Sequence, residues 1–206
     1  MNQKIIKNTL ILTAITLISG LLLGFVYEIT KEPIAASREN RKQEAYHTVF
    51  QEAETFQTFE AFEEKEAEEI LRNAGVSGCY VNEAALALDS GENAIGSVVT
   101  ATSKEGYGGE IKVSVGITLD GTVTGIELLS ISETAGLGMN AQEPEFKEQF
   151  QDVNTDHFEV VKGDGGKEGK IDVLSGATIT TDAVTNAVNA AVAYYHGAME
   201  GGSVNE

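Results

Sequence analysis

The sequence predicts an α+β protein in which an N-terminal membrane helix precedes one globular domain, an antiparallel sheet with flanking helices. Three patterns predict this architecture: an uncharged apolar run at 9–27, strict apolar and polar alternation at 111–119, and apolar residues at helical spacing over 184–195. The 206 residues are enough for an anchor and one core-forming domain. We divide the chain into a membrane anchor at 1–30, a helical connector that packs on the domain at 31–75, and the domain itself at 76–206.

The composition excludes several kinds of function. A formal net charge of -18 repels phosphate backbones and anionic lipid heads, so we expect no nucleic-acid partner. The single cysteine, Cys79, cannot form an internal disulfide or a zinc cluster, and its place in a predicted strand favours a buried, inert thiol. His47, His157 and His196 lack metal-ligand spacing. We therefore predict no metal site and no catalytic residue.

The apolar run at 9–27 has about the length needed to cross a bilayer as a helix. A secretory signal peptide has a shorter apolar core followed promptly by small residues, whereas here Lys31 and Glu32 precede the nearest small cluster, 35–37. This favours an anchor that is not cleaved. Positive residues flank the run on both sides, so their count does not decide its orientation.

Helical patterns continue after the anchor. Residues 34–50 are rich in helix formers and predict an amphipathic helix. Phe56, Phe59 and Phe62 recur every third residue, which is more typical of a face packed on the domain than of a cofactor site. The turn signal at 73–75 ends this region.

The centre of the domain is predicted to be an antiparallel sheet. A β-branched run at 95–102 and the alternating run at 111–119 predict two strands. Asp120-Gly121 is a strong hairpin signal, and 123–131 predicts the returning strand.

The C-terminal part returns to helix. We expect a helix at 143–150 and a short strand at 158–161, followed by a polar glycine-rich loop at 163–169 that lacks the spacing of a phosphate-binding P-loop. The loop is predicted to be a hinge or a surface loop. The last helix is expected to begin within 178–181.

The segment 172–178, Asp-Val-Leu-Ser-Gly-Ala-Thr, stands where the loop should become that last helix. A helix start offers unpaired backbone N–H groups and the positive end of the helix dipole, which suit a phosphate. Helix capping by Thr178 or Thr180 explains the same residues, since hydroxyl side chains are common at helix starts. The local sequence leaves both interpretations open.

Two further glycine-rich loops flank the sheet. One, at 105–109, precedes the alternating strand, and the other, at 132–138, follows its hairpin partner, so both lie near one edge. Glycines let the backbone approach a flat ligand, and Tyr107 could stack at its rim. Each loop alone is more typical of a turn. Together with the helix start they predict a pocket for an anionic aromatic ligand.

These segments resemble a known family. The segment 172–178 resembles the D-x-x-[ST]-G-A-T flavinylation motif of FMN-binding domains, and 132–138 resembles their E-T-P-G-L-G loop. The order of a single N-terminal span followed by this domain resembles that of the G subunit of the Rnf electron-transport complex. The C subunit of the sodium-pumping NADH:quinone reductase shares these features. The resemblance covers nearly the whole chain, most specifically 95–195. Ala135 replaces the usual proline, which removes a fixed φ from the loop.

The resemblance implies that FMN is attached through a phosphodiester to the Thr178 oxygen. A threonine hydroxyl is a poor nucleophile without an adjacent base, so a separate, metal-using FAD:protein FMN transferase is implied. Helix capping would then pass to Thr180 or Thr181. The implied recognition frame is Asp172, Ser175, Gly176 and Ala177, and the implied loop contacts are Tyr107, Glu133, Thr134, Gly136, Leu137 and Gly138. Lys162 could offset flavin or phosphate charge, or be a solvated lysine at a strand end.

The resemblance also implies a function. The chain would be the flavoprotein component of a bacterial membrane complex that couples ferredoxin/NAD electron transfer to Na⁺ or H⁺ translocation, with membrane and iron–sulfur subunits as partners. It would span the membrane once, carry its domain outside the cytoplasm and act alone only as an electron carrier. The alternatives are a quinone-reductase component or stand-alone extracytoplasmic flavoprotein, and a membrane-anchored binding module with no redox role.

Overall fold

In the computed structural model, residues 3–163, 165 and 168–200 are described. The chain forms two compact units, residues 1–42 and 43–206. The first unit consists of most of α1 (Gln3–Val49), which contains the predicted span and is long and apolar enough to cross a membrane by length and composition. The predicted connector helix is the C-terminal part of α1, because the helix continues without a break through residue 30 and past Pro33. The three-part division therefore stays a prediction.

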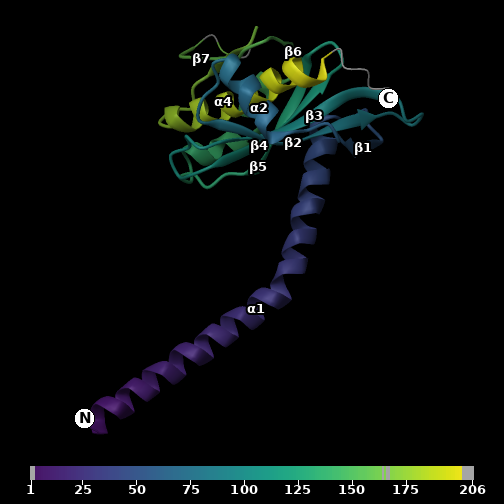
Figure 1. Cartoon of the computed structure of the whole chain (residues 1–206). Coiled ribbons are helices and arrows are strands. Elements are labelled where there is room, and N and C mark those ends of the chain that lie inside the picture. The colour runs from purple at the N-terminus through teal and green to yellow at the C-terminus, as the bar shows by residue number, and fades with distance from the viewer. Residues whose placement is uncertain (1–2, 164, 166–167, 201–206) are drawn as a thin grey trace. The chain divides into compact units, whose positions relative to one another are not determined.

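The second unit is built on an antiparallel sheet of six strands that follow one another in chain order (Figure 1). The predicted hairpin is confirmed, since β4 pairs with β5 across Asp120-Gly121. The short edge strands β1 and β6 have no counterpart in the predicted elements. The six strands are β1 (Thr55–Thr58), β2 (Cys79–Leu88), β3 (Ala94–Ser103), β4 (Ile111–Thr118), β5 (Thr122–Ser130) and β6 (Val153–Asn154).

Shorter elements fill the connections. The helix predicted at 143–150 is present but changes from α to 3₁₀ geometry within the segment. Two short strands form a separate parallel pair. The predicted loop at 163–169 follows the first of them, and its residues 164, 166 and 167 lie outside the described residues. These elements are α2 (Glu64–Asn73), η1 (Gly138–Gln142), α3 (Pro144–Lys147), η2 (Glu148–Phe150), β7 (Glu159–Val161), β8 (Lys170–Asp172), α4 (Thr178–Tyr194) and the π-helical η3 (Tyr195–Met199).

The main core lies between α4 and one face of the sheet (Figure 1). Val113, Val115 and Ile117 of β4 point to this face and are fully buried, as are Ala187 and Val188 of α4. Small and β-branched residues along α4 let the helix lie close to the strands, so burial of apolar area stabilises the layer. The predicted helix and the predicted inner face of the alternating strand are both confirmed.

The phenylalanine pattern has a different cause from the one predicted. Phe56 lies in β1, and it packs with the smaller cluster formed by Tyr46 and its neighbours at the end of α1. Phe59 and Phe62 precede α2 and pack instead against the main core. The three rings do contact the domain, but the idea that they form one stripe is wrong, because they belong to two clusters.

The end of α1 is seated on the other face of the sheet against Gly116. Gly116 of β4 and Gly125 of β5 are paired in register. A Cβ at Gly116 would lie 2.5 Å from the Val49 carbonyl oxygen, and that oxygen accepts a hydrogen bond from the Thr124 hydroxyl. The close approach therefore requires glycine at this point of the strand.

Candidate functional site

A cavity of about 610 Å³ lies where the two glycine loops meet the start of α4. The loop between β3 and β4 contributes Tyr107, the loop after β5 contributes a short run, and the helix start contributes the rest. The predicted convergence of three separate segments is confirmed. The cavity is lined by Tyr107, Glu133, Thr134, Leu137, Gly138, Gly176, Ala177, Thr178, Ile179 and Thr180.

A tight turn directly precedes α4. The Ala177 N–H donates to the Leu174 carbonyl at 2.9 Å, and Gly176 has a φ of 74°, a left-handed conformation that favours glycine. α4 then begins at Thr178, whose side chain is exposed and has no hydrogen-bond partner among the described residues. The N–H groups of this first turn have no carbonyl of the same helix to bond. The site therefore presents a free hydroxyl beside a helix N-terminus whose N–H groups and dipole favour a negative charge.

Thr181 has a role that the sequence did not indicate. Its fully buried hydroxyl accepts a hydrogen bond from the Leu174 N–H and donates one to the Ala177 carbonyl, both at 3.0 Å. The predicted capping by Thr180 or Thr181 is wrong, because both lie inside α4, and the N-cap residue, Ala177, has no side-chain cap bond within the described chain. Thr181 instead closes the turn that precedes the helix.

The two glycine loops interlock. The Gly108 N–H donates to Glu133 Oε1 at 3.2 Å, and a Cβ at Gly108 would lie 1.9 Å from the Ser132 carbonyl oxygen. In the second loop, a Cβ at Gly138 would lie 2.6 Å from the Thr180 hydroxyl oxygen. Backbone therefore packs directly on backbone and on α4, which fixes one wall of the cavity.

Large apolar side chains surround the cavity mouth while remaining open to solvent. Tyr107 is 73% exposed, Ile179 52% and Leu137 42%. Such groups are normally buried, and a cluster of them around a cavity fits an apolar ring system better than a small polar ligand. Ile179 was missed by the sequence analysis, although its position directly after Thr178 in the first helical turn could have indicated it.

Four predicted residues do not line the cavity. Asp172 ends β8, and its N–H donates to Gln149 Oε1 at 2.6 Å, so Gln149 is an unpredicted support of the motif. Ser175 is exposed in the turn, Gly136 lies in the second glycine loop, and Lys162 is exposed directly after β7. The charge-offsetting role of Lys162 stays a prediction. In the part of the chain that the structure describes, no group of three or more His, Cys, Asp or Glu residues could hold a metal ion.

Known proteins are similar to this chain over most of its length. The G subunit of the proton-translocating ferredoxin:NAD(+) oxidoreductase complex of Clostridium ljungdahlii is 35% identical over 181 residues, which cover 88% of this chain and 86% of that protein. The chain belongs to this G-subunit family. Within the family, the G subunit of the Na(+)-translocating ferredoxin:NAD(+) oxidoreductase complex of Acetobacterium woodii is 31% identical over 94% of this chain and 92% of its own. The G subunit of an ion-translocating oxidoreductase complex of Methanosarcina acetivorans is 29% identical over 94% and 95%.

Two family models match separate parts of this G-subunit chain. The FMN-binding domain matches residues 106–193, which include every residue that lines the cavity. The RnfG N-terminal region matches residues 1–49, which end where α1 ends. The crystal structure of Shewanella oneidensis NqrC overlaps 56% of this chain and 58% of its own, at 21% identity and a TM-score of 0.48.

Proposed function

We propose that the protein is the flavoprotein component of an ion-translocating ferredoxin:NAD oxidoreductase complex and that its FMN is attached to Thr178. One observation carries this proposal. The Thr178 hydroxyl is exposed and has no hydrogen-bond partner among the described residues, and it stands at a helix start that lines the cavity of an FMN-binding domain. FMN supplies the ability to accept electrons and pass them on. Attachment keeps the carrier in place between successive transfers.

The residues present fit FMN in size and chemistry. A cavity of about 610 Å³ lies within the usual range for cofactor sites. The N–H groups of the first turn of α4 would hold the phosphate, next to the hydroxyl that carries it. Tyr107, Leu137 and Ile179 would contact the apolar ring system, and the glycines of the interlocked loops leave room for it.

Attachment requires help from another protein. A threonine hydroxyl becomes a good nucleophile only with a base or metal beside it. No histidine lines the cavity among the described residues, and the Glu133 carboxylate in the lining accepts a hydrogen bond from the Gly108 N–H instead of from Thr178. An FAD:protein FMN transferase would therefore supply the activation: the Thr178 oxygen would lose its proton and attack the FMN phosphorus of FAD, and the pyrophosphate bond would break with AMP as the leaving group. This enzyme needs access to the hydroxyl, and Thr178 is exposed.

Membership of the G-subunit family supports the membrane placement and the partners that we propose. α1 would span the bilayer once, and the domain would lie outside the cytoplasm beside the membrane and iron–sulfur subunits of the complex. Relatives include components of a proton-translocating and a Na(+)-translocating complex, so both couplings occur among proteins similar to this one. Ion movement would belong to the assembled complex, with this chain relaying electrons.

The attachment residue can be tested in the full chain made in membranes together with an FMN transferase. A denaturing gel viewed under ultraviolet light should show a fluorescent band for the wild type and none for Thr178→Ala. Thr134→Ala is the matched control, since Thr134 is another hydroxyl of the cavity lining and should not carry the flavin. Fluorescence that survives in Thr178→Ala would overturn the assignment, and intact mass should show one FMN-sized increment in the wild type.

A further inference from the structure

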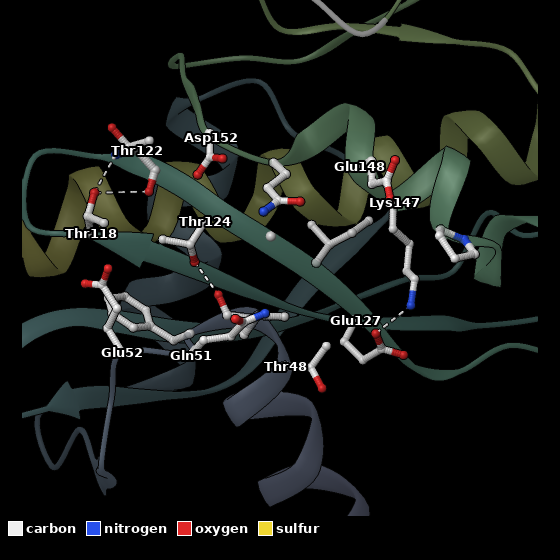
Figure 2. A pocket seen from close by; sticks show the side chains of 16 residues that line it. Thr48, Gln51, Glu52, Thr118, Thr122, Thr124, Glu127, Lys147, Glu148 and Asp152 are labelled. Atoms are coloured by element: carbon white, nitrogen blue, oxygen red, sulfur yellow. Dashed lines mark hydrogen bonds and ion pairs between the residues drawn. The ribbon is translucent and has the colours of Figure 1, made fainter.

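A second cavity, of about 460 Å³, lies elsewhere on the globular unit and shares no lining residue with the first (Figure 2). We call it the β5 groove. Its floor is β5, one wall is the end of α1 with the residues that follow it, and the other wall is the α3–η2 segment and its continuation. The groove is lined by Thr48, Val49, Phe50, Gln51, Glu52, Thr118, Thr122, Thr124, Gly125, Ile126, Glu127, Pro144, Lys147, Glu148, Gln151 and Asp152.

The floor of the groove is a stretch of β5 that, within the described chain, lacks a neighbouring strand on one edge and is contacted there by α3 and η2. β6 pairs only with Thr122 and Val123, so the stretch of β5 from residue 124 to 130 has no strand beside it on that edge among the described residues. In Figure 2, β5 crosses between the two walls, with Gln51 and Glu52 on one side and Glu148 and Asp152 on the other. Unpaired backbone groups along such an edge accept an added strand. The four floor residues, 124–127, would pair with about 13 Å of extended chain.

The charge of the walls selects the kind of chain. Four carboxylates line the groove, at Glu52, Glu127, Glu148 and Asp152, against one lysine. That lysine, Lys147, is already within 2.7 Å of Glu127 Oε2. The remaining carboxylates are exposed and favour a basic side chain, whereas they repel anionic lipid heads and a second copy of this acidic chain.

We propose that the β5 groove binds an extended segment of another subunit of the membrane complex, which adds to β5 as a strand and carries a lysine or arginine between the acidic walls. This inference rests on the proposed function, because it requires that the chain works inside such a complex. The main-chain pairing would supply affinity and the carboxylates would supply selectivity.

Charge reversal in the complete complex tests the acidic walls. Another subunit carries the affinity tag, and the amount of this chain retained after detergent extraction is measured. Glu148→Lys with Asp152→Lys should lower retention about tenfold at low salt, as expected for reversing two charges at an interface. The control is Glu60→Lys with Glu69→Lys, which makes the same change of charge at exposed positions outside the groove and should leave retention unchanged. Equal retention of both variants would overturn the inference.

Photocrosslinking tests the occupant. A photoreactive residue placed at Gln51 and another at Gln151 sample the two walls, and one at Gln57 on β1 is the control. Both groove positions should label the same short segment of one component of the complex, with a lysine or arginine in it, and Gln57 should not. No crosslink, crosslinks to lipid alone, or crosslinks from the two walls to unrelated segments would overturn the proposal.

The two proposals fail in different ways. If the wild-type chain shows no flavin fluorescence, or is absent from the purified complex, the proposed function is contradicted. A groove variant that keeps its fluorescent band and is retained normally would contradict only the inference about the groove. A groove variant that keeps the band and loses retention is the expected result.

Discussion

The Glu133 carboxylate accepts a hydrogen bond from the backbone N–H of Gly108 at 3.2 Å and so joins two loops that are 25 residues apart in the chain. Glu133 is half-buried and also lines the cavity. The bond therefore links the shape of the candidate flavin site to a contact between its two glycine loops.

Removing that contact should loosen the loops. Glu133→Ala should lower the free energy of unfolding by about 1 kcal/mol, the usual net worth of a partly exposed hydrogen bond. Amide exchange in the peptide spanning 104–110 should become faster. Glu133→Gln keeps an acceptor oxygen, so it should restore most of the protection. Identical exchange in all three proteins would contradict the role given to this contact.

The backbone packing of the loops predicts a steric effect. A methyl group at Gly108 would meet the Ser132 carbonyl oxygen at 1.9 Å, so Gly108→Ala must push the loops apart. We expect a loss of about 1–3 kcal/mol, typical of overpacking, together with a lower fraction of flavin-labelled protein. Gly125→Ala is the control, because its Cβ would make only an ordinary 3.9 Å contact with the Val49 Cα atom. Denaturant titration and in-gel fluorescence measure both effects.

Two buried threonines of α4 provide a matched pair. Thr181→Val removes both hydrogen bonds of the turn and leaves the Leu174 N–H without its acceptor, so it should cost about 1–3 kcal/mol. Thr185→Val should be neutral or stabilising, because the buried Thr185 hydroxyl has no partner among the described residues. Thr181→Ser keeps the hydroxyl and should retain more flavin labelling than Thr181→Val. Equal unfolding free energies for the two valine variants would contradict this account.

The buried hydroxyl of Tyr194 predicts alkaline sensitivity. Burial, with a smaller contribution from the charge of Glu66, raises the pKa of Tyr194 to about 12. Between about pH 10 and 12 the unfolded chain has released the phenol proton and the folded chain still holds it, so the unfolded state binds fewer protons. The free energy of unfolding should then fall as pH rises, by up to about 1.4 kcal/mol per pH unit from this group.

Substitution separates this effect from simple packing. Tyr194→Phe should flatten the decline between about pH 10 and 12 and cost little at about pH 7, since the Tyr194 hydroxyl has no hydrogen-bond partner in the described residues. Tyr195→Phe is the contrasting variant: its hydroxyl donates to the Leu119 carbonyl at 2.9 Å, so its loss should cost about 1 kcal/mol at neutral pH. Parallel pH profiles for the wild type and Tyr194→Phe would disprove the assignment.

The sequence predicted the parts of the fold that have a strong local period. The alternation in β4 and the helical spacing in α4 each persist over several residues, and Asp120-Gly121 marks the turn between β4 and β5. Because the glycine loops directly flank these elements, their convergence on one cavity could also be predicted.

Contacts between distant residues could not be predicted in this way. The Gln149 side chain reaches the Asp172 N–H across 23 positions, and Thr181 bonds back to the turn from inside the helix. Neither contact has a periodic signal. The spacing of Phe56 and Phe59 predicted one stripe. Spacing alone does not show that Phe56 lies in a strand and packs in one cluster, while Phe59 follows that strand and packs in another. Short elements such as β6 have too few residues to show any period.

The turn at Gly176 bears on whether the domain folds before the flavin is attached. The left-handed glycine, the hydrogen bond between Ala177 and Leu174, and the buried Thr181 hydroxyl together hold Thr178 at an accessible helix terminus in the folded domain. An enzyme that recognises this arrangement would therefore modify finished domains and pass over unfolded or misassembled ones. Under the proposed attachment, the yellow colour of a preparation would report how much of the chain has folded correctly, and cofactor loading would act as a checkpoint in biogenesis.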